Sequence, residues 1–292
     1  MHRFLLLVLA TWITSGCSKV SAPSAPYTCS YEQDLPSVTS AMKSGSIFLF
    51  GERHGTLEAP SFVADFACKI AKDSQEPTIV LLELAIPKIL SDLSVETMSV
   101  SQAQRLIIEG EDYWIKEGWD GRTSAAMMDA ILQILELREQ GLNIALGSIY
   151  PDENIRTKYD ELGLTFADEA THVNRYFQEA LQILGYKDEF ENVIVLSGKN
   201  HTRNHLRFFK KMELDETYMG FVQQSGGGSE WNCQPMAGGC GVHAAPTPHR
   251  DIVNSSDNAS LVILNKNEDI FDGAFVFKTT TASHPYHIES IE

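Results

Sequence analysis

Short apolar runs alternate with amphipathic stretches along most of the chain. Five runs of strand length, rich in β-branched, leucine and aromatic residues, lie at 46–50, 78–84, 143–149, 192–196 and 217–223. The stretches between them repeat apolar residues at helical spacing and predict helices at 60–72, 124–140, 165–184 and 201–211. Apolar strands that alternate with helices are typical of βαβ units. We therefore expect an α/β fold with a mostly parallel central sheet and helices on both faces.

Two segments depart from this alternation. Residues 87–120 have helical periodicity without a strand pattern, and we interpret them as a helical insertion that caps the functional site. Two later apolar runs, at 260–264 and 273–278, are expected to add a hairpin at the edge of the sheet. The folded body is predicted to be a single domain that spans residues 29–292.

The first residues have the layout of an export signal. Arg3 precedes an apolar run that is too short to cross a bilayer, and small residues follow it. We expect residues 1–16 to be a signal peptide. Cys17 then lies where a bacterial lipoprotein carries its lipid, although Thr14 stands where such signals usually have Leu. Ordinary secretion is the alternative.

Residues 17–28 are expected to form the lipidated cysteine and a flexible tether, because they are rich in Ser, Pro and Ala. No later apolar run is long enough to span a bilayer. The expected location is the outer membrane, with the body facing the periplasm and the lipid as its contact with the membrane. Otherwise the protein is periplasmic or secreted.

Four cysteines remain after Cys17, and an even number in an oxidising compartment predicts two disulfides. Cys233 and Cys240 are close together in a glycine-rich stretch and form the favoured pair, which leaves Cys29 with Cys68. Four cysteines allow three pairings, and the sequence does not choose among them. A thiolate metal site is the alternative, but the spacing contains no C-x-x-C.

The chain carries a formal net charge of −16. Such a surface repels nucleic acid and offers no basic patch for anionic lipid. We therefore expect no nucleic-acid partner.

The strongest local pattern joins a glycine and a histidine at the end of a predicted strand. Glu52 and His54 follow Gly51 directly after the apolar run at 46–50, and His201 stands in the same relation to Gly198. A Gly-x-x-His motif would occur about 0.6 times by chance in this composition, but here two follow buried-strand patterns. Ligands bind at the carboxyl ends of strands in open α/β sheets, so we expect one active site that contains both histidines.

A third strand end contributes Glu83, a carboxylate that is costly to bury without a partner. Two histidines with one or two carboxylates suit a divalent transition metal (Mn, Co or Zn), and the candidate ligands are His54, His201, Glu52 and Glu83. The same residues suit general-base activation of water, with Glu83 orienting an imidazole. A structural ion pair between Glu83 and a lysine or arginine is the alternative.

Three further features have both a functional and a structural interpretation. Arg122 precedes the helix predicted at 124–140 and could bind a substrate carboxylate or stabilise an oxyanion, but Thr123 or Ser124 is also a natural N-cap there. His205 lies four residues after His201 and is expected to be a solvated helix residue rather than a ligand. The glycine-rich stretch 226–241 is interpreted as a long loop that forms a disulfide-braced flap over the site.

These motifs resemble a known superfamily. Paired Gly-x-x-His motifs with an intervening strand-end glutamate are similar to those of the superfamily that joins Tiki and TraB proteins, ChaN-like haem-uptake lipoproteins and erythromycin esterases. The form Gly51-Glu52-Arg53-His54 is nearest the ChaN-like branch. The trailing Gly55-Thr56-x-Glu58 resembles the esterase branch, in which the histidine lies one residue further from the glycine.

The resemblance covers about residues 38–280 and implies an α/β fold with pseudo-symmetric halves. It also implies catalytic or metal-binding roles for Glu52, His54, Glu83 and His201. The branches differ in function, because Tiki members resemble metal-dependent peptidases, the esterases open a lactone ester, and ChaN-like members bind haem.

Two main hypotheses follow. The first is a hydrolase that cleaves an ester or amide bond of a small molecule or peptide with His-activated or metal-bound water. Its expected catalytic residues are Glu52, His54, Glu83, Arg122 and His201. The second is a non-catalytic surface lipoprotein that binds haem or another iron compound, and a structural envelope protein is a third, weaker hypothesis. The sequence contains no G-x-S-x-G, H-E-x-x-H or P-loop motif that would favour another enzyme class.

Overall fold

The protein is described from a computed structural model. The residues that the structure describes are 27–31, 33, 38–40, 45–95, 98–110, 114, 120–153, 155, 157, 172–214, 217–234, 239–247, 259–264 and 270–287. The predicted signal peptide, Cys17 and most of the predicted tether lie outside these residues. No helix in the described part of the chain is both long enough and apolar enough to cross a membrane.

A seven-stranded sheet forms the centre of the described fold, in the order β3-β2-β4-β1-β5-β9-β8. Its strands are β1 (Ser46–Glu52), β2 (Thr78–Leu82), β3 (Ile144–Ser148), β4 (Asn192–Gly198), β5 (Thr217–Ser225), β8 (Ser260–Ile263) and β9 (Gly273–Phe277). All neighbouring pairs are parallel except β8 with β9. The predicted α/β fold and the predicted edge hairpin are both confirmed.

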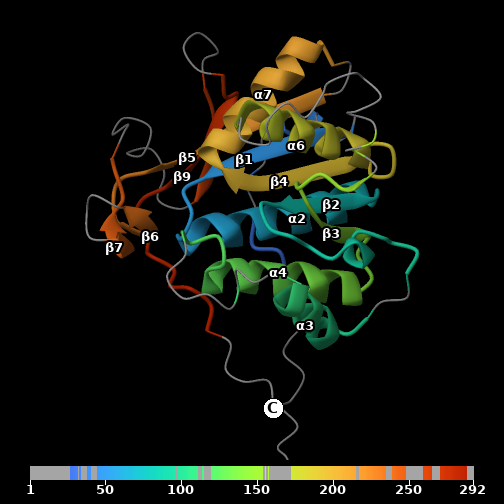
Figure 1. The fold of residues 1–292 in the computed structure, drawn as a ribbon, viewed down its shortest axis with the longest axis horizontal. Coiled ribbons are helices and arrows are strands. Elements are labelled where there is room, and N and C mark those ends of the chain that lie inside the picture. The colour runs from blue at the N-terminus through green and yellow to red at the C-terminus, as the bar shows by residue number, and fades with distance from the viewer. Residues whose placement is uncertain are drawn as a thin grey trace, which may run out of the picture.

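Helices cover both faces of the sheet (Figure 1). On one face lie α2 (Glu58–Ser74) and α4 (Ala125–Glu139), and on the other lie α6 (His172–Tyr186) and α7 (Lys199–Met212). Side chains alternate along each strand. Phe48 and Phe50 of β1 therefore join the core under α2 and α4, whereas Ile47 and Leu49 join the core under α6 and α7.

The segment predicted to cap the site contributes a short 3-10 helix, η1 (Lys88–Leu90), and α3 (Val100–Gly110). α3 packs against α4, on the side of α4 away from the sheet (Figure 1). Among the described residues of 87–120, Asp120 is the one that lines the cleft described below. The Ser124 side chain accepts a hydrogen bond from the Met127 amide, which confirms the predicted N-cap of α4.

Both disulfides of the favoured pairing are present, Cys29–Cys68 and Cys233–Cys240. Two disulfides are consistent with an exported protein. The prediction of a long loop at 226–241 is wrong, because β6 (Ser229–Gln234) and β7 (Gly239–Ala244) pair as an antiparallel hairpin there. Cys233 and Cys240 are directly opposite each other in this hairpin, so the disulfide joins its two strands.

Candidate active site

The two Gly-x-x-His motifs are brought together by the pairing of β1 with β4. Gly51 is paired with Ser197, and Glu52 with Gly198, so the two strands end at the same edge of the sheet. β4 continues two residues beyond the predicted run because its backbone keeps this pairing, and α7 begins directly after it at Lys199. His54 and His201 therefore approach the same point from neighbouring strands.

Glu83 lies between the two imidazoles. Its Oε2 is 3.7 Å from Nε2 of His54, and its Oε1 is 3.1 Å from Nε2 of His201. The Gly198 amide donates a hydrogen bond of 2.8 Å to Oε2. Glycine allows this close approach, because a Cβ on residue 198 would lie 2.9 Å from Nε2 of His54 and would force one of the two groups to move. Glu83 is only 5% exposed, so these donors replace the water that its carboxylate loses on burial.

His54 is held in place by Glu52. Nδ1 of His54 lies 2.9 Å from Oε1 of Glu52, which leaves Nε2 directed toward Glu83. Burial lowers the pKa of His54, but the hydrogen bond to Glu52 and the charges of Glu83, Glu52 and Asp120 outweigh it and raise the pKa to about 9. Oε2 of Glu52 is buried and has no hydrogen-bond partner among the described residues.

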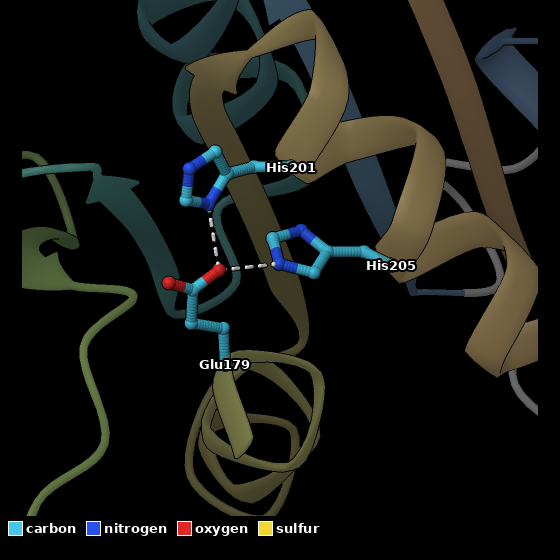
Figure 2. Close-up of side chains that lie close together, drawn as sticks. All are labelled: Glu179, His201 and His205. Carbon is cyan, nitrogen blue, oxygen red and sulfur yellow. Dashed lines mark hydrogen bonds and ion pairs between the residues drawn. The ribbon is translucent and has the colours of Figure 1, made fainter. Parts of the chain in front are cut away.

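His201 is held in a corresponding way by Glu179 of α6 (Figure 2). Oε2 of Glu179 lies 2.8 Å from Nδ1 of His201 and 3.0 Å from Nε2 of His205. Burial raises the pKa of Glu179, but the hydrogen bonds to the two imidazoles and their charges lower it to about 2.

The prediction that His205 is solvated is wrong. Its side chain is 0% exposed, because this face of α7 packs against α6 and Glu179 supplies a buried partner. Burial lowers the pKa of His205. The spacing of His201 and His205 correctly places them on one face of a helix, but it does not reveal whether that face is covered.

Arg122 also contacts Glu83. Its Nη1 lies 3.2 Å from Oε1 of Glu83, and its Nη2 lies 2.9 Å from Oδ2 of Asp120. Burial lowers the pKa of Arg122, but its bonds to Asp120 and the nearby charges raise it above its ordinary value. The arginine is therefore a permanent cation. The ion pair that the structural interpretation of Glu83 expects is present, and it lies inside the site rather than apart from it.

These groups surround an open cleft of about 580 Å³. All five predicted catalytic residues line it, namely Glu52, His54, Glu83, Arg122 and His201. The hairpin of β6 and β7 forms part of its wall through Glu230, Asn232, Cys233 and Gln234. Arg53 fastens this wall, because its Nε and Nη2 bind both carboxylate oxygens of Glu230 at 2.5 and 2.7 Å. The hairpin thus borders the site, as the flap hypothesis expects.

A slightly larger hollow, of about 690 Å³, lies beside α2 and is lined by residues such as Tyr31, Asp65 and Lys278. None of the predicted catalytic residues lines it. The smaller cleft is therefore the candidate active site.

The sequence analysis missed several residues of the site. Glu179 and Arg175 lie on α6, and Arg175 Nε binds Oε1 of Glu179 at 2.8 Å. The four-residue spacing of this pair was a signal for a helical ion pair, but not for its place behind His201. Asp120 and Glu230 lie in a loop and a hairpin, where no periodic pattern indicates which way a side chain points.

One group among the described residues could hold a metal ion, and it consists of Glu179, His201 and His205. It shares only His201 with the predicted ligand set of His54, His201, Glu52 and Glu83. The predicted set remains a prediction.

No protein-family model matches this chain, and no curated protein matches it. Among solved structures, it is similar to a succinoglycan biosynthesis protein, with 9% identity, a TM-score of 0.52, and coverage of 86% of this chain and 92% of that one. It is also similar to a Bacillus cereus protein, with 8% identity, a TM-score of 0.48, and coverage of 86% and 93%. A mutant erythromycin esterase in its open conformation matches with 10% identity, a TM-score of 0.44, and coverage of 87% and 95%. At such identities, the likeness to the first of these concerns the fold alone.

Proposed function

We propose that this protein is a hydrolase that cleaves an ester or amide bond. The observation that carries the proposal is the position of Glu83 between Nε2 of His54 and Nε2 of His201, at 3.7 and 3.1 Å, in an open cleft. An imidazole that is anchored by a carboxylate through Nδ1, with Nε2 facing the reacting atoms, is the arrangement of a general base. Glu52 and His54 form such a pair.

In the proposed reaction, neutral His54 takes a proton from water at Nε2, and the water oxygen forms a bond to the substrate carbonyl carbon. Arg122 and Nε2 of His201, which pair with Oε1 of Glu83 at 3.2 and 3.1 Å, would turn to the developing oxyanion as donors. The tetrahedral intermediate then breaks its bond to the leaving alcohol or amine, which takes the proton back from His54. With a pKa of about 9, about one His54 in a hundred is neutral at pH 7, so an alkaline optimum is expected.

A divalent ion (Mn, Co or Zn) held by His54, His201, Glu52 and Glu83 would supply a more acidic water to the same reaction. Imidazole and carboxylate groups are the right donor types for such an ion. Glu52, however, binds Nδ1 of His54, on the ring edge away from the Nε2 that faces Glu83, and the four residues do not form a group whose ligand atoms all lie within 4.8 Å of one another.

Superfamily membership and the lipid anchor belong to this proposal as well. The paired motifs, together with the fold likeness, support a place in the superfamily of ChaN-like proteins, Tiki and TraB proteins and erythromycin esterases. The export-signal layout and the two disulfides support an exported lipoprotein, anchored through Cys17 in the outer membrane. The haem-binding alternative has no such support, because most described residues that line the cleft are charged or polar, whereas haem needs an apolar slot.

The test is a hydrolysis screen with lactones, simple aryl esters and peptides, run with chelator-treated and metal-supplemented protein. His54→Gln is expected to abolish turnover, and His287→Gln, which changes an exposed histidine outside the cleft, serves as the matched control. Equal turnover in wild type and His54→Gln would overturn the role of His54. Saturable haem binding with a shifted Soret band, without turnover on any substrate, would favour the lipoprotein hypothesis.

A further inference from the structure

The side chains of Glu179, His201 and His205 converge on one point (Figure 2). Nδ1 of His201 and Nε2 of His205 both lie within 3.0 Å of Oε2 of Glu179. The two histidines are one helical turn apart on α7, and the glutamate reaches them from α6. Two imidazoles and one carboxylate are a frequent ligand set of zinc and related ions.

We propose that Glu179, His201 and His205 bind a divalent transition-metal ion, which replaces the hydrogen bonds that now join them. Ligands at about 2.1 Å from a tetrahedral ion lie about 3.4 Å from one another. The present distances of 2.8 and 3.0 Å from Oε2 to the two nitrogens therefore need to widen by only a few tenths of an ångström.

The hydrogen bonds of His205 are compatible with a bound ion. Nδ1 of His205 is buried and has no partner among the described residues. While Nε2 donates to Glu179, Nδ1 is the bare nitrogen, and once Nε2 binds a metal, Nδ1 carries the proton. The same atom is unpaired in both states, so metal binding leaves no additional polar group unsatisfied.

The position of this site separates it from the chemistry in the cleft. Glu179 and His205 are 0% exposed, and neither lines the cleft, whereas His201 does. The ion would therefore hold His201 by Nδ1 and leave its Nε2 facing Glu83, without touching the substrate. The ion would fix the orientation of the His201 ring. In many metal sites an outer carboxylate orients a metal-bound imidazole through its second nitrogen, and here the ion would take the place of that carboxylate. The inference does not depend on the proposed hydrolysis.

The first experiment measures metal binding by the full chain after chelator treatment. Titration with Co²⁺, followed by visible absorption, and competition with Zn²⁺ are expected to give one ion per chain. Glu179→Gln and His205→Asn each remove one ligand and are expected to weaken binding by at least about 100-fold. His54→Asn and Glu83→Gln are the matched controls, because they change residues that line the cleft but leave all three ligands in place.

Two results would overturn the inference. One is the absence of a stoichiometric ion in the wild type, and the other is a loss of binding that follows His54 and Glu83 instead of Glu179 and His205. A measurement on the wild type covers the case in which a variant fails to fold. Ring-nitrogen NMR with Zn²⁺ is expected to shift Nδ1 of His201 and Nε2 of His205, whereas a shift at Nε2 of His54 contradicts the proposed site.

Discussion

Oε1 of Glu83 lies 3.1 Å from Nε2 of His201, although the two residues follow strands that are separated by about 110 residues of the chain. The contact exists because β2 and β4 are neighbours in the sheet and run parallel. Glu83 follows β2 directly, and His201 lies in the first turn of the helix that follows β4. Three strand ends, those of β1, β2 and β4, thus supply the centre of the candidate site.

The pKa of His54, about 9, predicts the pH dependence of the proposed reaction. The neutral ring is the base, so kcat/KM is expected to rise with pH and to level off above about 9. The measurement is a pH–rate profile on the best substrate of the hydrolysis screen, with the fold checked by circular dichroism at each pH. A profile that falls as pH rises toward 9 would indicate that protonated His54 is the active form, and that it acts as an acid.

Glu179 is expected to make the free energy of unfolding depend on pH in the acid range. Its folded-state pKa of about 2 lies below its ordinary value of 4.5, so it stabilises the fold above pH 4.5, and this contribution is lost as the pH falls through 2. The size is on the order of 3 kcal/mol. Denaturant unfolding between pH 5 and pH 2 should therefore show a smaller pH-dependent loss for Glu179→Gln than for wild type.

The same variant should be about 3 to 5 kcal/mol less stable than wild type at pH 7, because it leaves buried partners without their carboxylate. Glu139→Gln changes an exposed glutamate of α4 and is expected to alter neither quantity. If Glu179→Gln and Glu139→Gln behave alike, the carboxylate does not have the buried role described for it.

Gly198→Ala should reduce activity more than stability. The added methyl group would lie 2.9 Å from Nε2 of His54 and 3.3 Å from Oε2 of Glu83, so one of these groups must move. A displacement of this kind is expected to lower kcat by roughly 10- to 100-fold. Gly241→Ala is the control, since no atom lies within 4 Å of a Cβ at that position. Full activity in Gly198→Ala would mean that the close approach of Gly198 to His54 has no part in catalysis.

The two disulfides should have different effects when they are replaced by serines. Cys233→Ser/Cys240→Ser frees the hairpin that lines the cleft, so KM should rise, while the short loop predicts a loss of stability of only about 2.5 kcal/mol. Cys29→Ser/Cys68→Ser opens a longer loop away from the cleft, so stability should fall by about 4 kcal/mol with KM unchanged. Equal KM values in all three proteins would contradict a role of the hairpin in substrate binding.

The sheet and the two histidines could be predicted because their signals are local. Each strand is a continuous apolar run, and the polar residue that follows it must lie at the edge of the sheet. His54, Glu83 and His201 were found in this way. Their mutual arrangement rests on the strand order β2-β4-β1, which places strands that are distant in sequence side by side.

The residues that sequence patterns missed depend on packing between elements. The burial of His205 and the role of Glu179 arise only when α6 and α7 lie side by side on one face of the sheet. The hairpin of β6 and β7 was hidden because glycines weaken a strand pattern and neither strand is an apolar run. The periodicity of a sequence describes one helix or strand at a time, so it does not predict contacts between two elements.

β1 and β4 each have hydrogen-bonded neighbours on both sides, since β1 lies between β4 and β5, and β4 lies between β2 and β1. Such inner strands open last when a protein fluctuates, and their amides exchange with solvent slowest. The loop with His54 and the helix α7 with His201 are thus attached to well-protected inner strands of the described sheet. The hairpin of β6 and β7, which also lines the cleft, is a separate two-stranded sheet without further neighbouring strands. It can therefore adapt to a ligand while the imidazoles stay in place.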